Sequence, residues 1–355
     1  MKQNNKNKKL HKAKEVKFDE FYTSLEDIET ELSHYYPPKN DRNVFKDKVI
    51  YCNCDDYEFS RFVTFFLLKF RTLELKELIV TCKTKILDTD SKKQKLIVNK
   101  ENLESIESKF GFRFDFLELN EENTLEFETK RSILKDFSLE LDLGCFESSQ
   151  NLGSYNCEEC LRLLEKCDIV VTNPPFSLFI DISKTIRSFN KDFIMIGNKL
   201  SLGYVFITKM MLDGELFLSK NIPKKFIDRD LKETKQVKLT EWFSTIETKR
   251  EYKEIKTGKF YYGNEAQYKF LDNNDNILYL ESWELLPEDY DGIIAVPVSF
   301  FNIYWNPELV EFLGSDATNI LDFKVEKPLI FNQRECFRRF FIRFTQKHLQ
   351  NFKKS

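Results

Sequence analysis

A tetrapeptide near the middle of the chain, Asn173-Pro174-Pro175-Phe176, combines residue types that suit chemistry on an aromatic amine. It follows an apolar run at residues 168–172 that predicts a short buried strand. The two prolines cannot continue a strand because they have no N–H group to donate, so the chain must leave the sheet in a stiff loop. A plain rigid turn is the alternative. The asparagine before the prolines and the aromatic residue after them favour a catalytic loop.

The chemistry gives each of these residues a role. The amino nitrogen of adenine is a weak nucleophile, because its lone pair is delocalised into the ring. The Asn173 side-chain oxygen and the Pro174 carbonyl oxygen would accept hydrogen bonds from that amino group and stabilise the charge that develops on it. Pro175 stiffens the turn, and Phe176 would supply an apolar face for an unstacked base. The tetrapeptide therefore predicts methyl transfer to an exocyclic amino group, with no covalent enzyme intermediate.

Alternating strands and helices are predicted to position this loop. Apolar runs predict strands at residues 48–54, 77–82, 138–143, 168–172, 193–196 and 215–218. Helical spacing predicts helices at residues 25–36, 59–67, 157–166, 178–189 and 204–212. Alternation at residues 112–116 and 125–127 predicts additional strands or a hairpin. This order predicts a mostly parallel α/β sheet covered on both faces, which binds ligands at the carboxyl ends of its strands.

The sequence pattern changes near Lys220. Beyond this point helical periodicity is weaker, and aromatic and turn residues become frequent. We expect a flexible basic arm at residues 1–18, a catalytic domain at 19–219 and a β-rich region that recognises the target at 220–355. Basic runs near both ends and after Lys220 are compatible with a DNA groove or with an ordinary solvated surface.

Composition narrows the class of protein. The chain has 355 residues and a formal net charge of −3, and it lacks an apolar run of the roughly 20 residues that span a bilayer. We therefore expect a cytoplasmic protein with no membrane partner. The eight cysteines are expected to be reduced thiols. Cys157 and Cys160 invite a zinc interpretation, but the histidines lie near the ends of the chain, so no metal site is predicted.

The tetrapeptide resembles the Asn/Asp/Ser-Pro-Pro-aromatic signature of amino-methyltransferases. The wider pattern resembles the EcoRI-type modification methylases, which are bacterial adenine-specific DNA methyltransferases. The matching stretches are residues 10–14, 19–23, 49–56, 168–179, 261–265, 290–292 and 296–298. The resemblance covers most of the chain and is weakest at residues 83–140 and 220–255.

The resemblance implies a Rossmann-like class I methyltransferase sheet with S-adenosylmethionine as its cofactor. It also implies double-stranded DNA as the partner and a functional pairing with a restriction endonuclease. We expect a monomer, because one chain suffices to methylate one strand at a time. The residues expected to bind the cofactor are Phe21, Tyr22 and Thr23, then Asn53, Cys54, Asp55 and Asp56, and finally Cys145 and Phe146. Simpler roles are open for some of them, since Phe21 and Tyr22 would also suit a core helix and Asp55-Asp56 a helix cap.

Two features depart from the usual methyltransferase pattern. No glycine occurs in residues 51–60, where a glycine-rich loop is common, and Thr81 and Cys82 stand where an acid usually holds the ribose hydroxyls. The same catalytic loop would also serve an enzyme that methylates a glutamine amide or RNA. A DNA-binding protein with an inactive methyltransferase fold is a third alternative. The intact tetrapeptide and the distinct second half favour the DNA enzyme.

Overall fold

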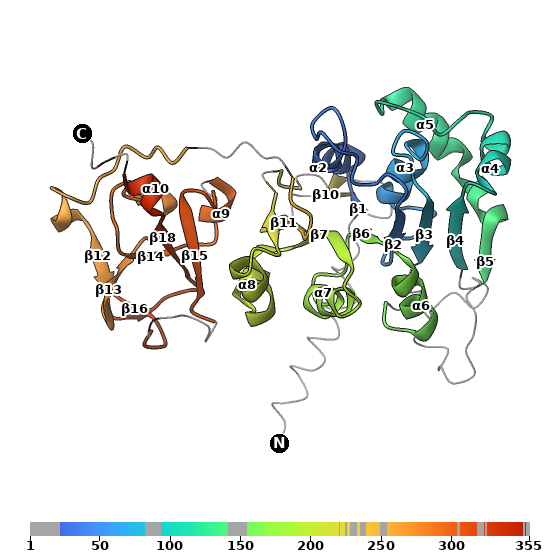
Figure 1. Cartoon of the computed structure of the whole chain (residues 1–355). Coiled ribbons are helices and arrows are strands. Elements are labelled where there is room, and N and C mark those ends of the chain that lie inside the picture. The colour runs from blue at the N-terminus through green and yellow to red at the C-terminus, as the bar shows by residue number, and fades with distance from the viewer. Residues whose placement is uncertain are drawn as a thin grey trace, which may run out of the picture. The chain divides into compact units, whose positions relative to one another are not determined.

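The computed structural model describes residues 22–81, 94–140, 155–219, 221–223, 226–227, 233–234, 239–248, 254–303, 306–317, 323, 325–350 and 352. The chain divides into two compact units (Figure 1), of which the first is drawn from Met1–Gly197 and Asn221–Lys249 and the second from Asn198–Lys220 and Arg250–Ser355. The division does not fall at a single boundary near Lys220. Residues 198–220 belong with the second unit, and residues 221–249 belong with the first.

A mixed sheet forms the centre of the first unit. Its strands lie in the order β5 (Ser138–Glu140), β4 (Gln94–Asn99), β3 (Glu77–Thr81), β2 (Val49–Cys52), β6 (Ile169–Thr172), β7 (Asp192–Asn198) and β11 (Thr240–Ser244). Strands β3, β2, β6 and β7 are parallel to one another, whereas β4 and β5 extend the sheet in antiparallel fashion. The predicted α/β fold is confirmed, with a sheet that is mixed because β4 runs antiparallel to both of its neighbours, β3 and β5.

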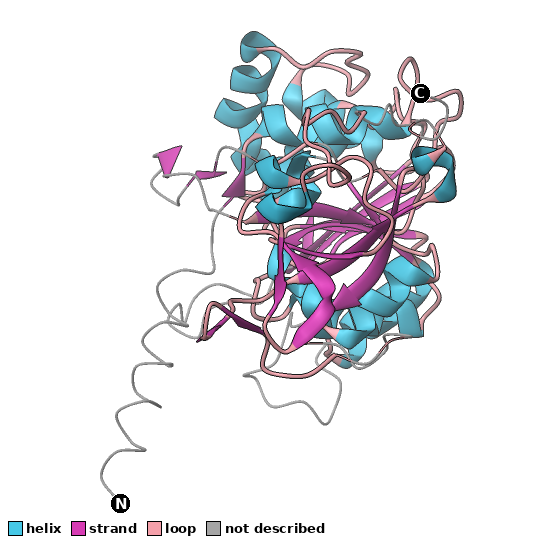
Figure 2. Ribbon diagram, turned by 90° about the vertical axis from the view of Figure 1, so that its left-hand side faces the viewer, coloured by secondary structure: helices cyan, strands magenta, loops and turns pink. Residues whose placement is uncertain are grey.

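Helices cover both faces of this sheet (Figures 1 and 2): α2 (Leu25–Leu32) and α3 (Arg61–Leu68) on one face, and α6 (Glu158–Lys166) and α7 (Phe179–Ser188) on the other. The side chains of β2 alternate between the two layers. Ile50 and Cys52 pack into the core beneath α2 and α3, while the Tyr51 hydroxyl forms a 2.7 Å hydrogen bond with that of Thr81 on the α6 side. Because both faces are buried, the strands appear in the sequence as continuous apolar runs.

The strands predicted at residues 112–116 and 125–127 are wrong. Residues 125–127 lie in α5 (Glu121–Lys130), which begins with a capping box between Asn120 and Asn123. Within that helix Phe127 is fully buried and Leu125 is 65% exposed, so the apparent alternation came from one core residue and one surface residue. Phe112, Phe114 and Phe116 form no strand; their rings all pack on the same core.

The remaining elements of the first unit are short. They are the strands β1 (Tyr22–Thr23), β9 (Phe226–Ile227) and β10 (Glu233–Thr234), the helix α4 (Leu103–Phe110), and the 3-10 helices η1 (Ser33–Tyr35) and η2 (Arg131–Phe137). No helix in the described part of the chain is long and apolar enough to cross a membrane.

The second unit is rich in β-structure, as expected. Its main sheet has the order β12 (Lys269–Leu271), β13 (Asn274–Tyr279), β14 (Ile293–Val296), β18 (Phe340–Phe344) and β15 (Val310–Ser315). A separate hairpin joins β16 (Ile330–Phe331) to β17 (Arg334–Glu335). The other elements are β8 (Phe217–Leu218), the helices α8 (Val205–Leu212), α9 (Phe300–Ile303) and α10 (Gln346–Leu349), and the 3-10 helices η3 (Lys199–Gly203), η4 (Glu265–Gln267) and η5 (Trp283–Leu285).

Candidate active site

The candidate site lies where the connections of the sheet change direction. Strands β3 and β6 flank β2 on opposite sides, and β2 runs parallel to both, with Ile50 opposite Ile169 on β6. In open α/β sheets such a switch point opens a crevice at the carboxyl ends of the strands. The loop at residues 53–60, after β2, and the loop at residues 173–178, after β6, therefore leave the sheet side by side.

The Asn-Pro-Pro-Phe tetrapeptide forms the second of these loops, as predicted. Pro174 is buried, while Asn173, Pro175 and Phe176 are half-buried. The Leu178 N–H donates a 2.8 Å hydrogen bond to the Pro175 carbonyl and so closes a turn that leads into α7. Phe176 packs on the edge of the core shared by α2 and α3. The loop is thus held at both ends, with the aromatic ring against the protein.

Thr23 lies next to the catalytic loop although it is 150 residues away in the sequence. The Asn173 Nδ2 donates a 3.4 Å hydrogen bond to the Thr23 hydroxyl, which is buried. Thr23 is held by β1, whose backbone pairs with Phe226 of β9. The hydrogen bond orients the Asn173 amide, with Oδ1 as its acceptor atom. The amino-terminal motif and the tetrapeptide therefore belong to one site.

The carboxylate of Asp55 joins the two loops. Its Oδ1 accepts a 2.6 Å hydrogen bond from the Ser60 hydroxyl, and its Oδ2 accepts a 2.5 Å hydrogen bond from the Thr172 hydroxyl. The backbone N–H of Asn173 also donates to this carboxylate. Burial raises the pKa of Asp55 to about 6, and these hydrogen bonds partly oppose the rise because they favour the ionised form. Asp55 therefore fixes the start of the catalytic loop.

The neighbours of Asp55 shape the first loop. Asp56 accepts a 2.7 Å hydrogen bond from the Glu58 N–H on its side chain and a 2.8 Å hydrogen bond from the Ser60 N–H on its carbonyl. Helix α3 is capped by Ser60, whose hydroxyl accepts from the Phe62 N–H, so neither aspartate is the N-cap residue. Cys54 is half-buried at the start of the loop.

Asn53 provides a direct test of whether a ligand fits this loop. Its side chain is 3% exposed, and within the described part of the chain its Oδ1 atom has no hydrogen-bond partner. A buried amide oxygen without a partner costs about 1–3 kcal/mol, and proteins rarely leave one so. The site thus offers an acceptor for a polar group of a bound molecule.

Only part of the predicted site can be located. Phe21, Cys145 and Phe146 lie outside the described residues, and only the backbone of Tyr22 is described. The structure brings Thr23, Asp55 and Asn173 together. It adds Ser60 and Thr172, which the sequence analysis missed. A serine directly before a helical pattern is a recognisable cap, but no local signal shows that Thr172 donates to a residue 117 positions away.

Comparison with known sequences gives the family. The sequence pattern of the family described as adenine-specific methyltransferase EcoRI matches residues 9–347. The chain belongs to this EcoRI-type family. It is 32% identical over 331 residues to the Type II methyltransferase M.EcoRI of Escherichia coli, which covers 88% of this chain and 90% of that protein. It is 28% identical over 322 residues to M.MpnI of Mycoplasma pneumoniae, covering 86% and 84%. No solved structure matches this chain.

Membership confirms the resemblance and the activity expected from the tetrapeptide. The protein is an adenine-specific DNA methyltransferase. A third relative, the Type II methyltransferase M.MgeORF184P of Mycoplasma genitalium, is 27% identical to it over 349 residues. The family's sequence pattern matches residues 9–347, and this range includes both loops at the switch point.

Proposed function

We propose that the enzyme transfers the methyl group of S-adenosylmethionine to the exocyclic amino nitrogen of adenine in duplex DNA, and that residues 173–176 carry the catalysis. The observation that supports this most strongly is the link through Asp55. Its carboxylate accepts hydrogen bonds from Ser60 in the loop at residues 53–60 (the donor loop) and from Thr172, which precedes the catalytic loop at residues 173–178. A bound donor and a bound base would then share one rigid frame, and alignment of two reactants is a major source of catalysis.

The catalytic loop acts on the amino group of the base. The Asn173 Oδ1 and the Pro174 carbonyl accept hydrogen bonds from its two N–H bonds, which draws electron density toward the nitrogen and stabilises the charge that forms there. The hydrogen bond from Asn173 Nδ2 to Thr23 keeps the acceptor atom pointed in one direction. The Phe176 ring, half-buried against the core, supports the plane of a base that has been rotated out of the duplex.

The donor is proposed to bind against the loop after β2 and the amino-terminal motif, namely Phe21, Tyr22, Thr23, Asn53, Cys54, Asp55 and Asp56, with Cys145 and Phe146 beside its adenine. When bound, S-adenosylmethionine supplies an electrophilic methyl group on a sulfonium. The Asn53 Oδ1 supports this placement, because a buried acceptor suits the donor's ammonium or hydroxyl groups. Asp56 would add negative charge near the ammonium group.

The second unit is proposed to read the DNA sequence, while the first carries the chemistry. Support comes from exposed aromatic side chains that stand next to cations in the sequence, at Lys259-Phe260 and at Phe337-Arg338. Phe337 is 70% exposed and Phe260 43% exposed. Aromatic and cationic side chains bind bases and phosphates respectively. The counterpart of the predicted 220–355 recognition region is then residues 250–355.

We also propose that the enzyme acts as a monomer in the cytoplasm and is the modification partner of a restriction endonuclease. The support is the Type II designation of its relatives. One chain suffices to methylate one strand at a time.

Transfer of tritium from labelled S-adenosylmethionine to DNA, RNA and protein, each offered separately, tests the proposal. We expect label in DNA alone, recovered as N6-methyladenine after digestion to nucleosides. Label in RNA or in protein glutamine would favour the other substrate classes. DNA binding without any transfer would favour the inactive fold. The Asn173→Ala variant serves as the matched control for transfer by a contaminating enzyme.

A further inference from the structure

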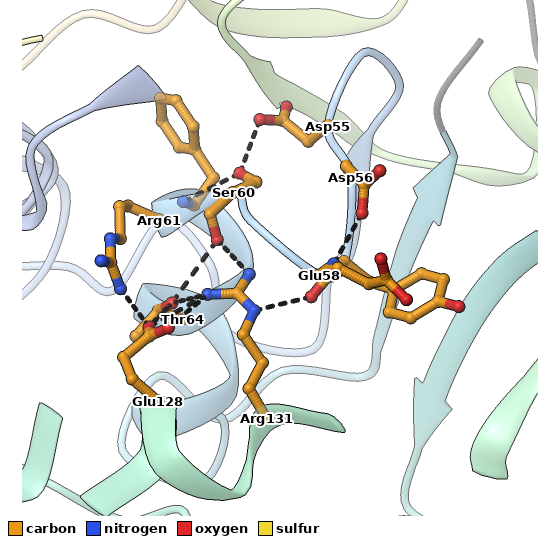
Figure 3. A network of polar contacts seen from close by, with 10 residues as sticks. Asp55, Asp56, Glu58, Ser60, Arg61, Thr64, Glu128 and Arg131 are labelled. Carbon is orange, nitrogen blue, oxygen red and sulfur yellow. Dashed lines mark hydrogen bonds and ion pairs between the residues drawn. The ribbon is translucent and has the colours of Figure 1, made fainter. Parts of the chain in front are cut away.

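The loop after β2 keeps its shape without glycine. None of residues 53–60, all within the described part of the chain, has a positive φ. Hydrogen bonds from the Phe59 and Ser60 N–H groups to the Asp56 carbonyl close its turn. The backbone carbonyls of Tyr57 and Ser60, also in this loop, both accept hydrogen bonds from one buried side chain, Arg131 (Figure 3).

Arg131 holds the loop through two of its guanidinium nitrogens and helix α3 through the third. Its Nε donates to the Tyr57 carbonyl at 2.8 Å, its Nη2 to the Ser60 carbonyl at 2.6 Å, and its Nη1 to the Thr64 hydroxyl at 2.8 Å. The side chain is only 6% exposed, and it forms an ion pair at 3.0 Å with Glu128, which also pairs with Arg61 at the start of α3. The planar fork of arginine matches two carbonyls at fixed spacing, which the single ammonium of lysine cannot do.

Ser60 connects Arg131 to the catalytic loop through hydrogen bonds. Its carbonyl accepts from Arg131, its hydroxyl donates to Asp55, and Asp55 accepts in turn from the Thr172 hydroxyl and the Asn173 N–H. A continuous series of hydrogen bonds therefore runs from the start of η2 to the residue that is proposed to bind the target amino group. Because Arg131 is buried, it would act on the donor and the base only through these hydrogen bonds.

We infer that Arg131 is a positioning residue for methyl transfer, holding the donor loop in its binding conformation in place of a glycine-rich turn and, through Ser60 and Asp55, fixing the catalytic loop. The inference rests on the proposed function for the identity of the donor. A purely structural role for the buried pair with Glu128 is the alternative, and it predicts a loss of stability alone.

Three variants of the full chain separate these roles. Arg131→Lys keeps the charge but loses the fork, Glu128→Gln removes the countercharge but keeps the loop contacts, and Lys130→Met removes a neighbouring cation that bonds the Phe110 carbonyl and Glu126 instead. We expect Arg131→Lys to raise the dissociation constant for S-adenosylmethionine by about tenfold or more and to lower kcat, as measured by calorimetry and methyl transfer below the melting temperature. Glu128→Gln should lower the melting temperature with donor affinity within about threefold of wild type. Lys130→Met should leave both the melting temperature and the affinity for S-adenosylmethionine close to wild type.

Hydrogen exchange in the absence of donor makes the outcome independent of the proposed function. The amides of residues 55–60 should exchange faster in Arg131→Lys than in Glu128→Gln. A folded Arg131→Lys variant with wild-type donor affinity, or with wild-type exchange in this loop, would overturn the inference. If the wild-type enzyme does not bind S-adenosylmethionine at all, the proposed function fails, and the exchange measurement alone decides the role of Arg131.

Discussion

Hydroxyl groups set the geometry of the polar residues in this site. Thr23 accepts from the Asn173 amide, and Ser60 and Thr172 both donate to the Asp55 carboxylate. All three hydroxyls are buried, so each hydrogen bond is protected from competition with water. Asn173 and Asp55 are therefore presented in single orientations before any ligand arrives, which is the condition for electrostatic catalysis.

Replacing Asn173 with alanine should remove most of the activity. Loss of one such acceptor lowers the rate by about 100- to 1000-fold, whereas the dissociation constant for S-adenosylmethionine should stay within about threefold because the side chain acts on the base. Asn173→Asp, which keeps an acceptor oxygen, should retain more activity than Asn173→Ala. Steady-state methyl transfer and calorimetry measure the two effects. An alanine variant with near wild-type turnover would contradict the assignment.

The raised pKa of Asp55 should appear in the pH dependence of stability. Because the folded pKa of about 6 exceeds the ordinary value of 3.8, the folded protein binds the proton more tightly. The stability that this proton contributes is present at low pH and is lost as the pH rises through about 6. The free energy of unfolding of wild type relative to Asp55→Asn should therefore be about 1 kcal/mol greater at about pH 5 than at about pH 7.5. Urea denaturation at both pH values measures this, and an unchanged difference would contradict it.

Strand β11 shows how a late segment completes the catalytic unit. It lies next to β7 in the sheet, and the Thr245 N–H donates a 3.0 Å hydrogen bond to the Phe193 carbonyl. Trp242, which is fully buried, meets the ring of Phe62 in α3 edge-on, with centroids 5.9 Å apart. A chain ending at Lys220 would lack this strand and its core residue. Residues 240–244 therefore support the helix that follows the donor loop.

Trp242→Ala should destabilise the protein by about 3–5 kcal/mol, because it removes a large ring from a closed core. Trp283→Ala is a suitable comparison, since Trp283 is half-buried in the second unit and should cost less. Thermal and chemical denaturation measure both. A loss of less than about 1 kcal/mol for Trp242→Ala would show that β11 is not an integral part of the core of the first unit.

The charge of the whole molecule is nearly balanced, with 55 basic and 58 acidic residues. Net charge therefore gives little general attraction to DNA, and binding must depend on locally placed cations. Several cations of the second unit are already paired on the surface, such as Arg343 with Glu311 and Lys347 with Glu308. Arg334 and Lys259 are exposed, and if the second unit reads the DNA as proposed, they are cations that would meet phosphates.

DNA affinity should fall steeply with salt, by about 0.9 log units per phosphate contact for each log unit of salt concentration. Affinity for S-adenosylmethionine should respond little, because its proposed site is made of buried hydrogen bonds in the first unit. Fluorescence anisotropy of a labelled duplex and calorimetry of the donor, over the same salt series, provide the comparison. A flat salt response of DNA binding would argue against phosphate contacts by these cations. Arg334→Gln should reduce the slope by about one contact.

The amino-acid sequence by itself determined the features that depend on local signals. Short apolar runs marked the strands β2, β3, β6 and β7, since a strand buried on both faces is apolar throughout. The prolines of the tetrapeptide marked the end of β6. Family membership followed from the same tetrapeptide together with matches spread along the chain.

Only the tertiary structure decided which polar groups meet. Thr23 bonds Asn173 across 150 residues, Thr172 bonds Asp55 across 117, and Arg131 bonds Ser60 across 71. It also decided that residues 221–249 belong to the first unit and that residues 121–130 form a helix. The physical reason is that a hydrogen bond depends on distance and angle between two atoms, and folding sets these for partners whose separation along the chain leaves no periodic trace in the sequence.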